Sequence, residues 1–286
     1  MKVDIAVATR CTLGEGPVWD PVRGALLWLD IDAQVLHSLD ADGVHTATPL
    51  DRRVSLALPA SGGGLVTAGG FAVHLADEQG GNPDLLAELP RAGESGTNDG
   101  AVDRHGSLWV GTVDRSGAAE GAIFRVTGDG SVSRIRSGVA LSNGIDWSPD
   151  GRRVYHSDSL TGRVDTAMVD DSGLPGGWSP FVEVDTIPDG LTVDAEGGVW
   201  LALWNGGSVH RYTPDGRLDR VVAVPGGHIT SCAFGGSDLS TLFITTARVG
   251  LDDEALARQP HAGALFAVDA GVTGRAPTPF ADAGGS

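Results

Sequence analysis

Cysteine, positive charge and long apolar runs are all scarce in this chain, and each scarcity excludes a class of protein. The two cysteines, Cys11 and Cys232, fall short of a disulfide framework. Because the sequence shows no secretory signal, we expect both to be buried reduced thiols. The apolar patch near the N-terminus is only about five residues long, too short for a signal core or a membrane span. We therefore expect a cytoplasmic protein without a membrane partner.

Basic residues are outnumbered by acidic ones. The chain has 20 Lys and Arg against 37 Asp and Glu, which gives a formal net charge of −17. This charge would repel a phosphate backbone, and no run of Lys and Arg offsets it. The charge is typical of a solubilising acidic surface. The sequence therefore argues against nucleic acid as a partner.

No stretch has the length and periodicity of an amphipathic helix. Apolar runs last about four to seven residues before Gly, Pro, Asp or Asn interrupts them. Residues 251–259 come closest, and we expect a loop or a single turn there. With 43 glycines and 41% apolar residues, the composition favours an all-β chain in which residues 1–286 form one domain. Residues 271–286, rich in Gly, Ala and Pro, are expected to form a flexible tail.

A short hairpin unit recurs along the chain. In its clearest copy, Asp194 and Gly197 stand first and fourth in a turn, as a type I turn prefers. An apolar run at residues 199–203 follows and is typical of a buried strand. The copies lie roughly 40 to 45 residues apart, a period typical of propeller blades, so six copies predict a six-bladed β-propeller with four-stranded blades. The copies span residues 15–31, 55–69, 98–114, 143–159, 187–204 and 231–247.

Closing such a propeller requires one blade built from both ends of the chain. Residues 3–8 alternate weakly and are expected to form a strand that pairs with residues 264–268. Trp28, Trp109 and Trp200 fall at nearly equivalent strand positions, so we interpret them as residues that pack the blades.

Four oxygen-bearing side chains occupy nearly matched positions in the repeat. Glu15 lies nine residues before the glycine of its turn, and Asn98, Asn143 and Asp189 each lie eight before theirs. Because the first strand of every blade lines the central channel, we expect the four side chains to converge there. Oxygen donors without Cys or His suit a hard divalent cation, and the two carboxylates match its charge. The alternative is that each is an ordinary turn residue, since Asn-Gly and Asp-Gly pairs are common in turns.

Six motifs run along the chain: LGEGPVWD (13–20), TNDGAVD (97–103), LSNGIDWSPDGRRVYHSDS (141–159), IPDGLTVDAEGGVW (187–200), NGG (205–207) and TSCAFGG (230–236). Together they resemble the senescence marker protein/gluconolactonase/regucalcin family over nearly the whole chain. The resemblance implies a six-bladed propeller that binds one divalent metal ion in its central channel and hydrolyses sugar lactones. It implies that Glu15, Asn143 and Asp189 are metal ligands. It also implies that Asn98 lies close to the metal and contacts the substrate.

The chain departs from the family at one position. Where the family usually has an arginine two residues before Asn-Asp-Gly, this sequence has Gly96. Losing a guanidinium removes a multidentate donor, so the substrate could differ from the usual aldonolactones or another residue could fill in. Arg91 and Glu120 are candidates because both lie in loops that flank the third hairpin, and Glu120 is our candidate second substrate-binding residue. The alternative for each is an exposed loop charge.

Site chemistry suggests a mechanism for lactone hydrolysis. A metal-bound carbonyl is polarised toward attack by water, and its oxyanion is stabilised. We expect Asp189 to be the catalytic base and Glu15 to be mainly an anchoring ligand. Calcium and zinc are favoured over magnesium, manganese and iron(II), and the sequence does not choose between the first two.

Two other functions stay open. The same set of residues could support a phosphotriesterase or another ester hydrolase, or the chain could be a calcium-binding propeller scaffold without enzymatic activity. For the lactonase, the expected substrate is a small aldonolactone such as glucono-, xylono- or arabinonolactone. We expect a monomer or a weak homodimer. His228 precedes the sixth inner strand and either reaches the channel mouth or is a turn or surface residue.

Overall fold

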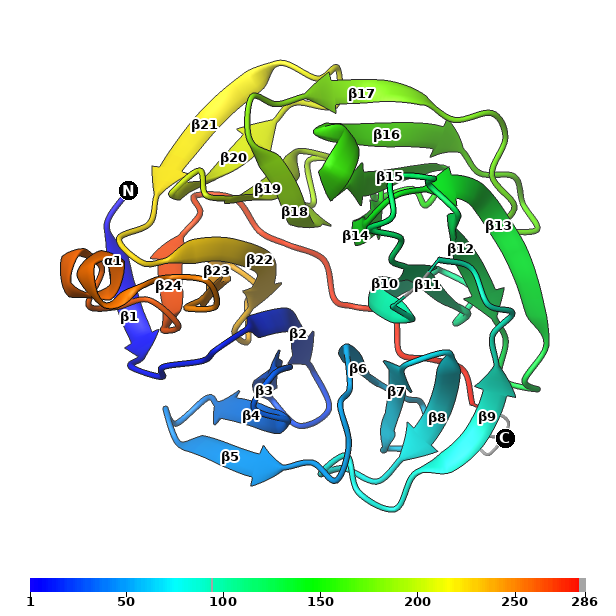
Figure 1. Ribbon diagram of the computed structural model, residues 1–286, viewed down its shortest axis with the longest axis horizontal. Coiled ribbons are helices and arrows are strands. Elements are labelled where there is room, and N and C mark those ends of the chain that lie inside the picture. The colour runs from blue at the N-terminus through cyan, green and yellow to red at the C-terminus, as the bar shows by residue number, and fades with distance from the viewer. Residues whose placement is uncertain (94, 283–286) are drawn as a thin grey trace. The chain divides into compact units, whose positions relative to one another are not determined.

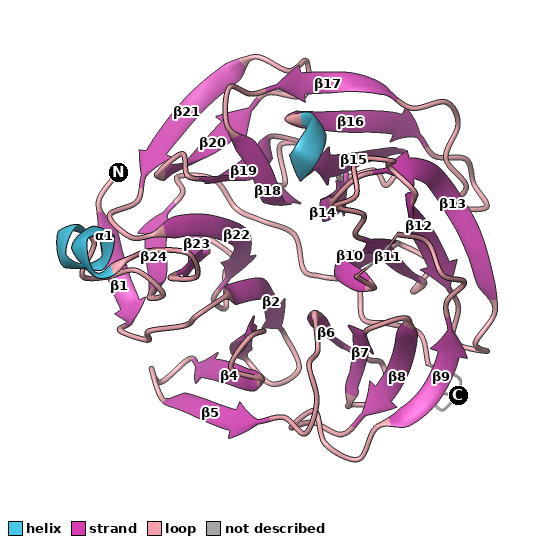
Figure 2. Ribbon diagram, in the orientation of Figure 1, coloured by secondary structure: helices cyan, strands magenta, loops and turns pink. Residues whose placement is uncertain are grey.

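The computed structural model describes residues 1–93 and 95–282, and most of them form β-strands (Figures 1 and 2). The chain divides into two compact units. The terminal unit comprises Met1–Pro49 and Val184–Ala276, and the middle unit comprises Leu50–Glu183 and Pro277–Ser286. Each unit contains three of the six four-stranded antiparallel sheets. The predicted fold class, an all-β six-bladed propeller with four-stranded blades, is confirmed.

The terminal unit holds the first, fifth and sixth blades. Their strands, in the order in which they pair, are β2 (Gly14–Asp20), β3 (Ala25–Asp30), β4 (Val35–Asp40) and β5 (His45–Pro49); β18 (Ile187–Val193), β19 (Val199–Trp204), β20 (Ser208–Tyr212) and β21 (Leu218–Ala223); and β22 (His228–Gly235), β23 (Thr241–Ala247), β24 (Leu265–Asp269) and β1 (Val3–Val7).

The middle unit holds the second, third and fourth blades. Their strands are β6 (Leu56–Pro59), β7 (Leu65–Gly69), β8 (Ala72–Ala76) and β9 (Asp84–Glu88); β10 (Thr97–Val102), β11 (Leu108–Thr112), β12 (Gly121–Val126) and β13 (Val132–Val139); and β14 (Ser142–Trp147), β15 (Arg153–Asp158), β16 (Arg163–Met168) and β17 (Ser179–Glu183). A single 3₁₀ turn, η1 (Ser159–Thr161), joins β15 to β16.

The sixth blade is closed by both ends of the chain, as predicted. β1 pairs antiparallel with β24, with Val3 opposite Val268 and Ile5 opposite Phe266. Figure 1 shows the blue N-terminal strand beside the red β24. Hydrogen bonds from the first strand to the last therefore complete this sheet.

Residues 253–258 form a short helix, α1 (Asp253–Arg258), where the sequence predicts a loop or a single turn. Asp252 precedes it, and its Oδ1 accepts a hydrogen bond from the backbone N of Ala255 at 2.8 Å, an N-cap that stabilises the first turn. Among the described residues, no helix has the length and apolar character needed to cross a bilayer.

Asp194 shows why the repeated Asp-x-x-Gly turns form. Its Oδ1 accepts hydrogen bonds from the backbone N of Glu196 at 2.9 Å and of Gly198 at 2.8 Å. Gly197 has a φ of 86°, a region that favours glycine. Asp103 accepts the equivalent two bonds in the middle unit. The carboxylate at the first position thus accepts hydrogen bonds from N–H groups of the turn.

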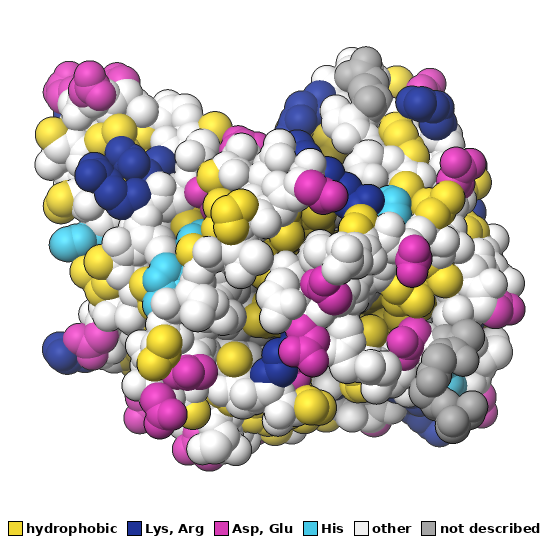
Figure 3. Space-filling model, turned by 90° about the horizontal axis from the view of Figure 1, so that it is seen from below, with side chains coloured by type: hydrophobic (Ala, Val, Ile, Leu, Met, Phe, Trp, Pro, Cys, Tyr) yellow, Lys and Arg dark blue, Asp and Glu magenta, His cyan; other side chains and the backbone are white. Residues whose placement is uncertain are grey.

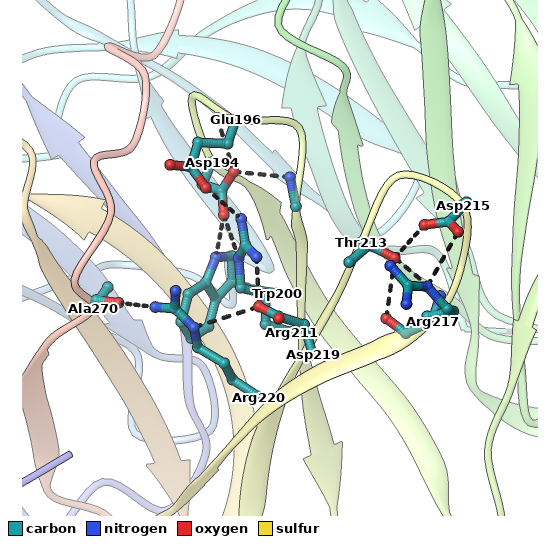
Figure 4. Close-up of polar contacts among 11 residues, drawn as sticks. Asp194, Glu196, Trp200, Arg211, Thr213, Asp215, Arg217, Asp219, Arg220 and Ala270 are labelled. Carbon is teal, nitrogen blue, oxygen red and sulfur yellow. Dashed lines mark hydrogen bonds and ion pairs between the residues drawn. The ribbon is translucent and has the colours of Figure 1, made fainter.

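The other carboxylate oxygen of Asp194 joins three parts of its blade (Figure 4). Oδ2 accepts hydrogen bonds from Trp200 Nε1 at 2.8 Å and from Arg211 Nε at 2.7 Å, and all three side chains are buried. The same arrangement recurs in the third blade with Asp103, Trp109 and Arg125. The predicted packing role of the tryptophans is confirmed, since Trp28, Trp109 and Trp200 are all buried.

The C-terminal segment differs from the expected flexible tail at residues 280–282. Phe280 is fully buried in the core of the middle unit. Its backbone N donates to the carbonyl oxygen of Pro59 at 2.8 Å, and Asp282 Oδ1 accepts from the backbone N of Gly62 at 2.8 Å. Burial of this one aromatic side chain outweighs the composition of the segment around it. Residues 283–286 lie outside the described residues.

The surface carries charges of both signs. Figure 3 shows Asp and Glu side chains at many separate points of one face, with Lys and Arg among them. The acidic side chains on the face drawn are thus dispersed and not gathered in one patch, as expected of a solubilising surface.

Candidate metal and substrate site

Irregular strand pairing occurs at the four positions that the repeat singles out, and also in β22 between Ile229 and Ser231. β2, β10, β14 and β18 each shift register once against the next strand, near the start of the inner strand. The shifts begin at or enclose Glu15, Asn98, Asn143 and Asp189. A β-bulge re-aims the side chains at the point where it interrupts the ladder. The fainter second copy lacks this feature, because β6 and β7 pair without a shift.

Glu15 and Asp189 lie in the terminal unit, on strands that both pack against β22 (Figure 1). They are buried, with exposed fractions of 9% and 3%. Thr230 on β22 donates from Oγ1 to the carbonyl oxygen of Gly14 at 2.6 Å. A Cβ at Gly190 would overlap the Ser231 side chain, so this close approach requires glycine. Two consecutive residues of β22 thus hold the strands that carry the two carboxylates.

His228 begins β22 and is buried. Its ring stacks on the Trp204 ring with the centroids 4.2 Å apart and an angle of 4° between the planes. Burial lowers the pKa of His228, against a hydrogen bond to the backbone at Val249 that raises it. The histidine is therefore a packed ring on an inner strand rather than a surface residue.

Asn98 and Asn143 lie in the middle unit and touch each other. Asn98 Nδ2 donates to Asn143 Oδ1 at 3.0 Å and to the carbonyl oxygen of Ser142 at 2.8 Å. Asn143 Nδ2 donates to Ser159 Oγ at 2.8 Å, and Asn143 is 5% exposed. The structure therefore brings together two of the four predicted residues from adjacent blades.

Behind Ser142 lies a buried polar chain that sequence reasoning missed. Ser142 Oγ is 2.9 Å from His156 Nε2, and Arg136 Nη1 donates to His156 Nδ1 at 3.0 Å. Arg136 also pairs with Asp165. Since arginine can only donate, Nε2 carries the histidine proton and donates it to Ser142. Burial first, and Arg136 second, hold the pKa of His156 well below its usual value, so the ring stays neutral.

Asp99 also lies in the irregular segment of β10, and sequence reasoning did not single it out. Burial raises the pKa of Asp99 to about 6, against a hydrogen bond from the backbone N of Gly100 at 2.7 Å. The signal in the sequence is the Asn-Asp-Gly triplet, of which the repeat offsets mark only the first residue.

Gly96 stands where no side chain fits. Its φ is 82°, and a Cβ there would lie 2.6 Å from the carbonyl carbon of Gly70. Glu120 is exposed in the loop before β12, where its backbone N donates to Asp114 Oδ2 at 2.7 Å. Arg91 is exposed, and its guanidinium lies 5.0 Å from the centre of the Phe71 ring. Arg91 thus packs on the turn between β7 and β8, and the backbone of Glu120 is tied to Asp114.

The predicted ligand set contains two carboxylates and one amide. Within residues 1–93 and 95–282, no group of three or more His, Cys, Asp or Glu side chains is arranged to hold a metal ion. The set of Glu15, Asn143 and Asp189 would take one of its oxygens from Asn143, so it does not depend on such a group. Its chemistry suits a hard cation, because all three are oxygen donors and all three are buried.

Known proteins resemble this chain over almost its full length. Regucalcin from Danio rerio is 35% identical over 97% of both chains. The putative sugar lactone lactonase YvrE from Bacillus subtilis (strain 168) is 34% identical over 98% of this chain and 99% of its own. The crystal structure of a calcium-binding protein, regucalcin, from Agrobacterium tumefaciens is 33% identical and matches with a TM-score of 0.89 over 96% of both chains.

The sequence model of one family, the SMP-30/Gluconolactonase/LRE-like region, matches residues 13–248. That match includes all five inner strands with irregular pairing, β2, β10, β14, β18 and β22. The matches to individual proteins cover almost the full length of the chain as well. The chain belongs to the SMP-30/gluconolactonase/LRE-like family.

Proposed function

We propose that the protein is a metal-dependent lactonase that hydrolyses a small aldonolactone, such as glucono-, xylono- or arabinonolactone, to the aldonic acid. The observation that carries the proposal is the set of buried oxygen-bearing side chains at the irregular points of the inner strands. The 34% identity to a putative sugar lactone lactonase over 98% of this chain supports the choice of substrate class.

Glu15, Asn143 and Asp189 are the proposed ligands of one divalent cation. Burying a carboxylate is costly unless a positive charge or hydrogen bonds compensate it, and a divalent cation supplies that charge. Calcium and zinc are the proposed ions, and the regucalcin resemblance favours calcium, because the relative from Agrobacterium tumefaciens is described as calcium-binding. When bound, the cation supplies Lewis acidity toward the lactone carbonyl oxygen.

Asp189 is the proposed general base. Its carboxylate accepts a proton from the water that attacks the carbonyl carbon. The bond between that carbon and the ring oxygen then breaks, and the ring oxygen takes the proton back from Asp189 to become a hydroxyl group. Glu15 anchors the cation and takes no proton. The products are one aldonic acid and a carboxylate site restored to its starting state.

Asn98 and Glu120 are the proposed substrate-binding residues. Both hydrogens of Asn98 Nδ2 are already donated, so this residue would accept a hydrogen bond from a sugar hydroxyl through Oδ1. Glu120 would likewise accept from a hydroxyl. Because Gly96 leaves no place for the usual arginine, the pattern of hydroxyl recognition is expected to differ from that of relatives that carry one.

The test is a panel of aldonolactones against a panel of phosphotriesters, each measured with and without a chelator. We expect acid release from a five- or six-carbon aldonolactone, lost with chelator and restored by added Ca²⁺ or Zn²⁺. Asp189→Asn should reduce kcat at least about 100-fold, in line with the loss of a general base. Asp185→Asn, an exposed carboxylate on the same segment, is the matched control and should retain activity.

Two other outcomes would replace the proposal. Hydrolysis confined to phosphotriesters would assign the site to another ester hydrolase. If cation binding were measurable while every lactone and ester remained intact, the protein would be a calcium-binding scaffold.

A further inference from the structure

Asn143 can act as a metal ligand in only one of two orientations of its side-chain amide. The oxygen and nitrogen ends of a carboxamide have nearly the same shape, but only the oxygen can bind a cation. In this structure Oδ1 accepts a hydrogen bond from Asn98 Nδ2, and Nδ2 donates to Ser159 Oγ. The orientation is set by whichever neighbour can pair with only one end of the amide.

Ser159 by itself does not decide it. A hydroxyl group can both donate and accept, so its chemistry is compatible with either end of an amide, whereas an NH₂ group is compatible with one end only. Asn98 presents an NH₂ group, which can only donate. A reversed Asn143 would bring two NH₂ groups together, and burial makes such an unpaired donor costly.

The orientation of Asn98 is itself fixed by the backbone. Its Nδ2 donates to the carbonyl oxygen of Ser142, and a carbonyl oxygen can only accept. Reversing Asn98 would place its own Oδ1 against that carbonyl. Both hydrogens of Nδ2 are therefore assigned, one to Ser142 and one to Asn143.

Ser142 is held in place by its strand pairing and by its side chain. Ser142 lies opposite Asp158 in the pairing of β14 with β15. Its side chain meets His156, whose other nitrogen accepts from Arg136. All of these residues lie in the middle unit, and the donor and acceptor roles run in one direction from Arg136 to Ser142.

We propose that Asn98 is a positioning residue that sets which end of the Asn143 amide is the oxygen, and so makes Asn143 competent to bind a cation. The inference rests on the proposed function, because it takes Asn143 to be a metal ligand. It adds to the substrate contact proposed for Asn98 Oδ1, because the positioning role uses Nδ2. A substrate contact affects KM, whereas positioning of a ligand affects cation affinity when no substrate is present.

The test is isothermal titration calorimetry with Ca²⁺ alone and with Zn²⁺ alone, on the full chain without substrate. The variants are Asn98→Ala, Asn143→Ala and the double variant. We expect Asn98→Ala to weaken cation binding by about 10-fold or more, as is typical when an outer partner of a ligand is removed. If Asn98 acts through Asn143, the double variant should bind no more weakly than Asn143→Ala, so the two effects are not additive.

Two further variants test whether cation affinity depends on the hydrogen-bond donor of Asn98, and not on the loss of any contact or on a change in charge. Ser159→Ala removes a hydrogen bond from the other end of the same amide and should weaken binding less than Asn98→Ala does. Asn98→Asp keeps the size of the side chain but turns its donor group into an acceptor. It should weaken binding although it adds a negative charge. Thermal unfolding of each variant checks that the fold is retained.

Contrary results fall into distinguishable classes. Unchanged cation affinity in Asn98→Ala, additive effects in the double variant, or tighter binding in Asn98→Asp would each overturn the positioning role and leave the proposed function standing. Unchanged affinity in Asn143→Ala would overturn the proposed ligand set, and the positioning role with it.

Discussion

Gly96 occupies a backbone position that excludes every side chain for two independent reasons. Its positive φ disfavours any residue with a Cβ, and the backbone of Gly70 fills the space where a Cβ would go. An arginine at this position is therefore incompatible with the local backbone of this chain. Restoring the arginine would require residues 70 and 96 to move apart.

Gly96→Ala is expected to lower the free energy of unfolding by about 3 kcal/mol, combining backbone strain with overlap. Gly117→Ala is the matched control, because Gly117 also has a positive φ but open space around it. It should cost only the strain, about 1 kcal/mol. Urea unfolding measures both. Equal losses in the two variants would show that overlap with Gly70 contributes nothing.

His37 is expected to make stability depend on pH. It packs against Trp28 and His45, and burial, followed by His45, lowers its pKa to about 4. The unfolded chain, with an ordinary histidine pKa of about 6.5, then binds an extra proton between these values. Stability is therefore lost as pH falls from about 6.5 toward 4. The stability difference between the wild type and His37→Gln should shrink over that range, and parallel curves in urea unfolding would contradict this.

Single residues also show how far the sequence could lead toward the site. Asn98, Asn143 and Asp189 were identified because each precedes a turn glycine by the same number of residues. Ser159 and His156 were missed, since their roles depend on contacts that join different strands and leave no periodic pattern. Contacts of this kind follow from packing, which a single sequence does not display.

At the scale of elements, the Asp-Trp-Arg arrangement ties three parts of one blade together. Arg211 is nearly buried and also pairs with Asp219 at 2.6 Å and with Glu196 at 3.0 Å (Figure 4). Removing the shared carboxylate would leave Trp200 Nε1 and one end of Arg211 buried without their acceptor. Buried pairs are costly to break from one side, even where their formation adds little stability.

Asp194→Ala is accordingly expected to lower the free energy of unfolding by about 3 kcal/mol. Asp215→Ala is the matched control. Asp215 pairs with Arg217 at 3.2 Å on an exposed turn of the same blade, and Figure 4 shows both sites. An exposed pair is screened by water and contributes little, so Asp215→Ala should leave the free energy of unfolding nearly unchanged. Chemical denaturation compares the two, and a loss in Asp194→Ala as small as that in Asp215→Ala would refute a special role for the buried carboxylate.

Strand positions could be predicted closely because turn residues delimit them. The strands predicted at residues 3–8, 199–203 and 264–268 correspond to β1, β19 and β24. The short helix α1 was not predicted, since six residues are too few for a clear helical period, and its start depends on the Asp252 cap. Local turn chemistry was thus informative for strands and insufficient for a helix of this length.

At the scale of the whole molecule, the repeat predicted the number of blades correctly. The composition of the C-terminal residues predicted a flexible tail, which is wrong at Phe280. Six copies at a regular spacing correspond to the six observed sheets. The Gly, Ala and Pro content of residues 271–286 suggested a flexible tail, yet Phe280 is part of a core cluster. A single aromatic residue that packs into a core hardly changes the average composition of a segment, so composition does not reveal it.

Phe280→Ala is expected to lower the free energy of unfolding by about 3 to 5 kcal/mol, as for a fully buried phenylalanine. Phe280→Leu keeps most of the apolar volume and should cost less than about 1.5 kcal/mol. Guanidinium unfolding would distinguish them. If both variants were as stable as the wild type, the docking of residues 280–282 would be energetically irrelevant.

During synthesis, β1 leaves the ribosome long before its partner β24 exists, because 22 strands lie between them in the chain. The sixth blade cannot be completed until residue 269 has been made, whereas Leu50–Glu183 supplies the blades of the middle unit as one continuous stretch. An unpaired strand is a template for aggregation. Prematurely terminated chains that lack β24 should therefore be the products most dependent on chaperones.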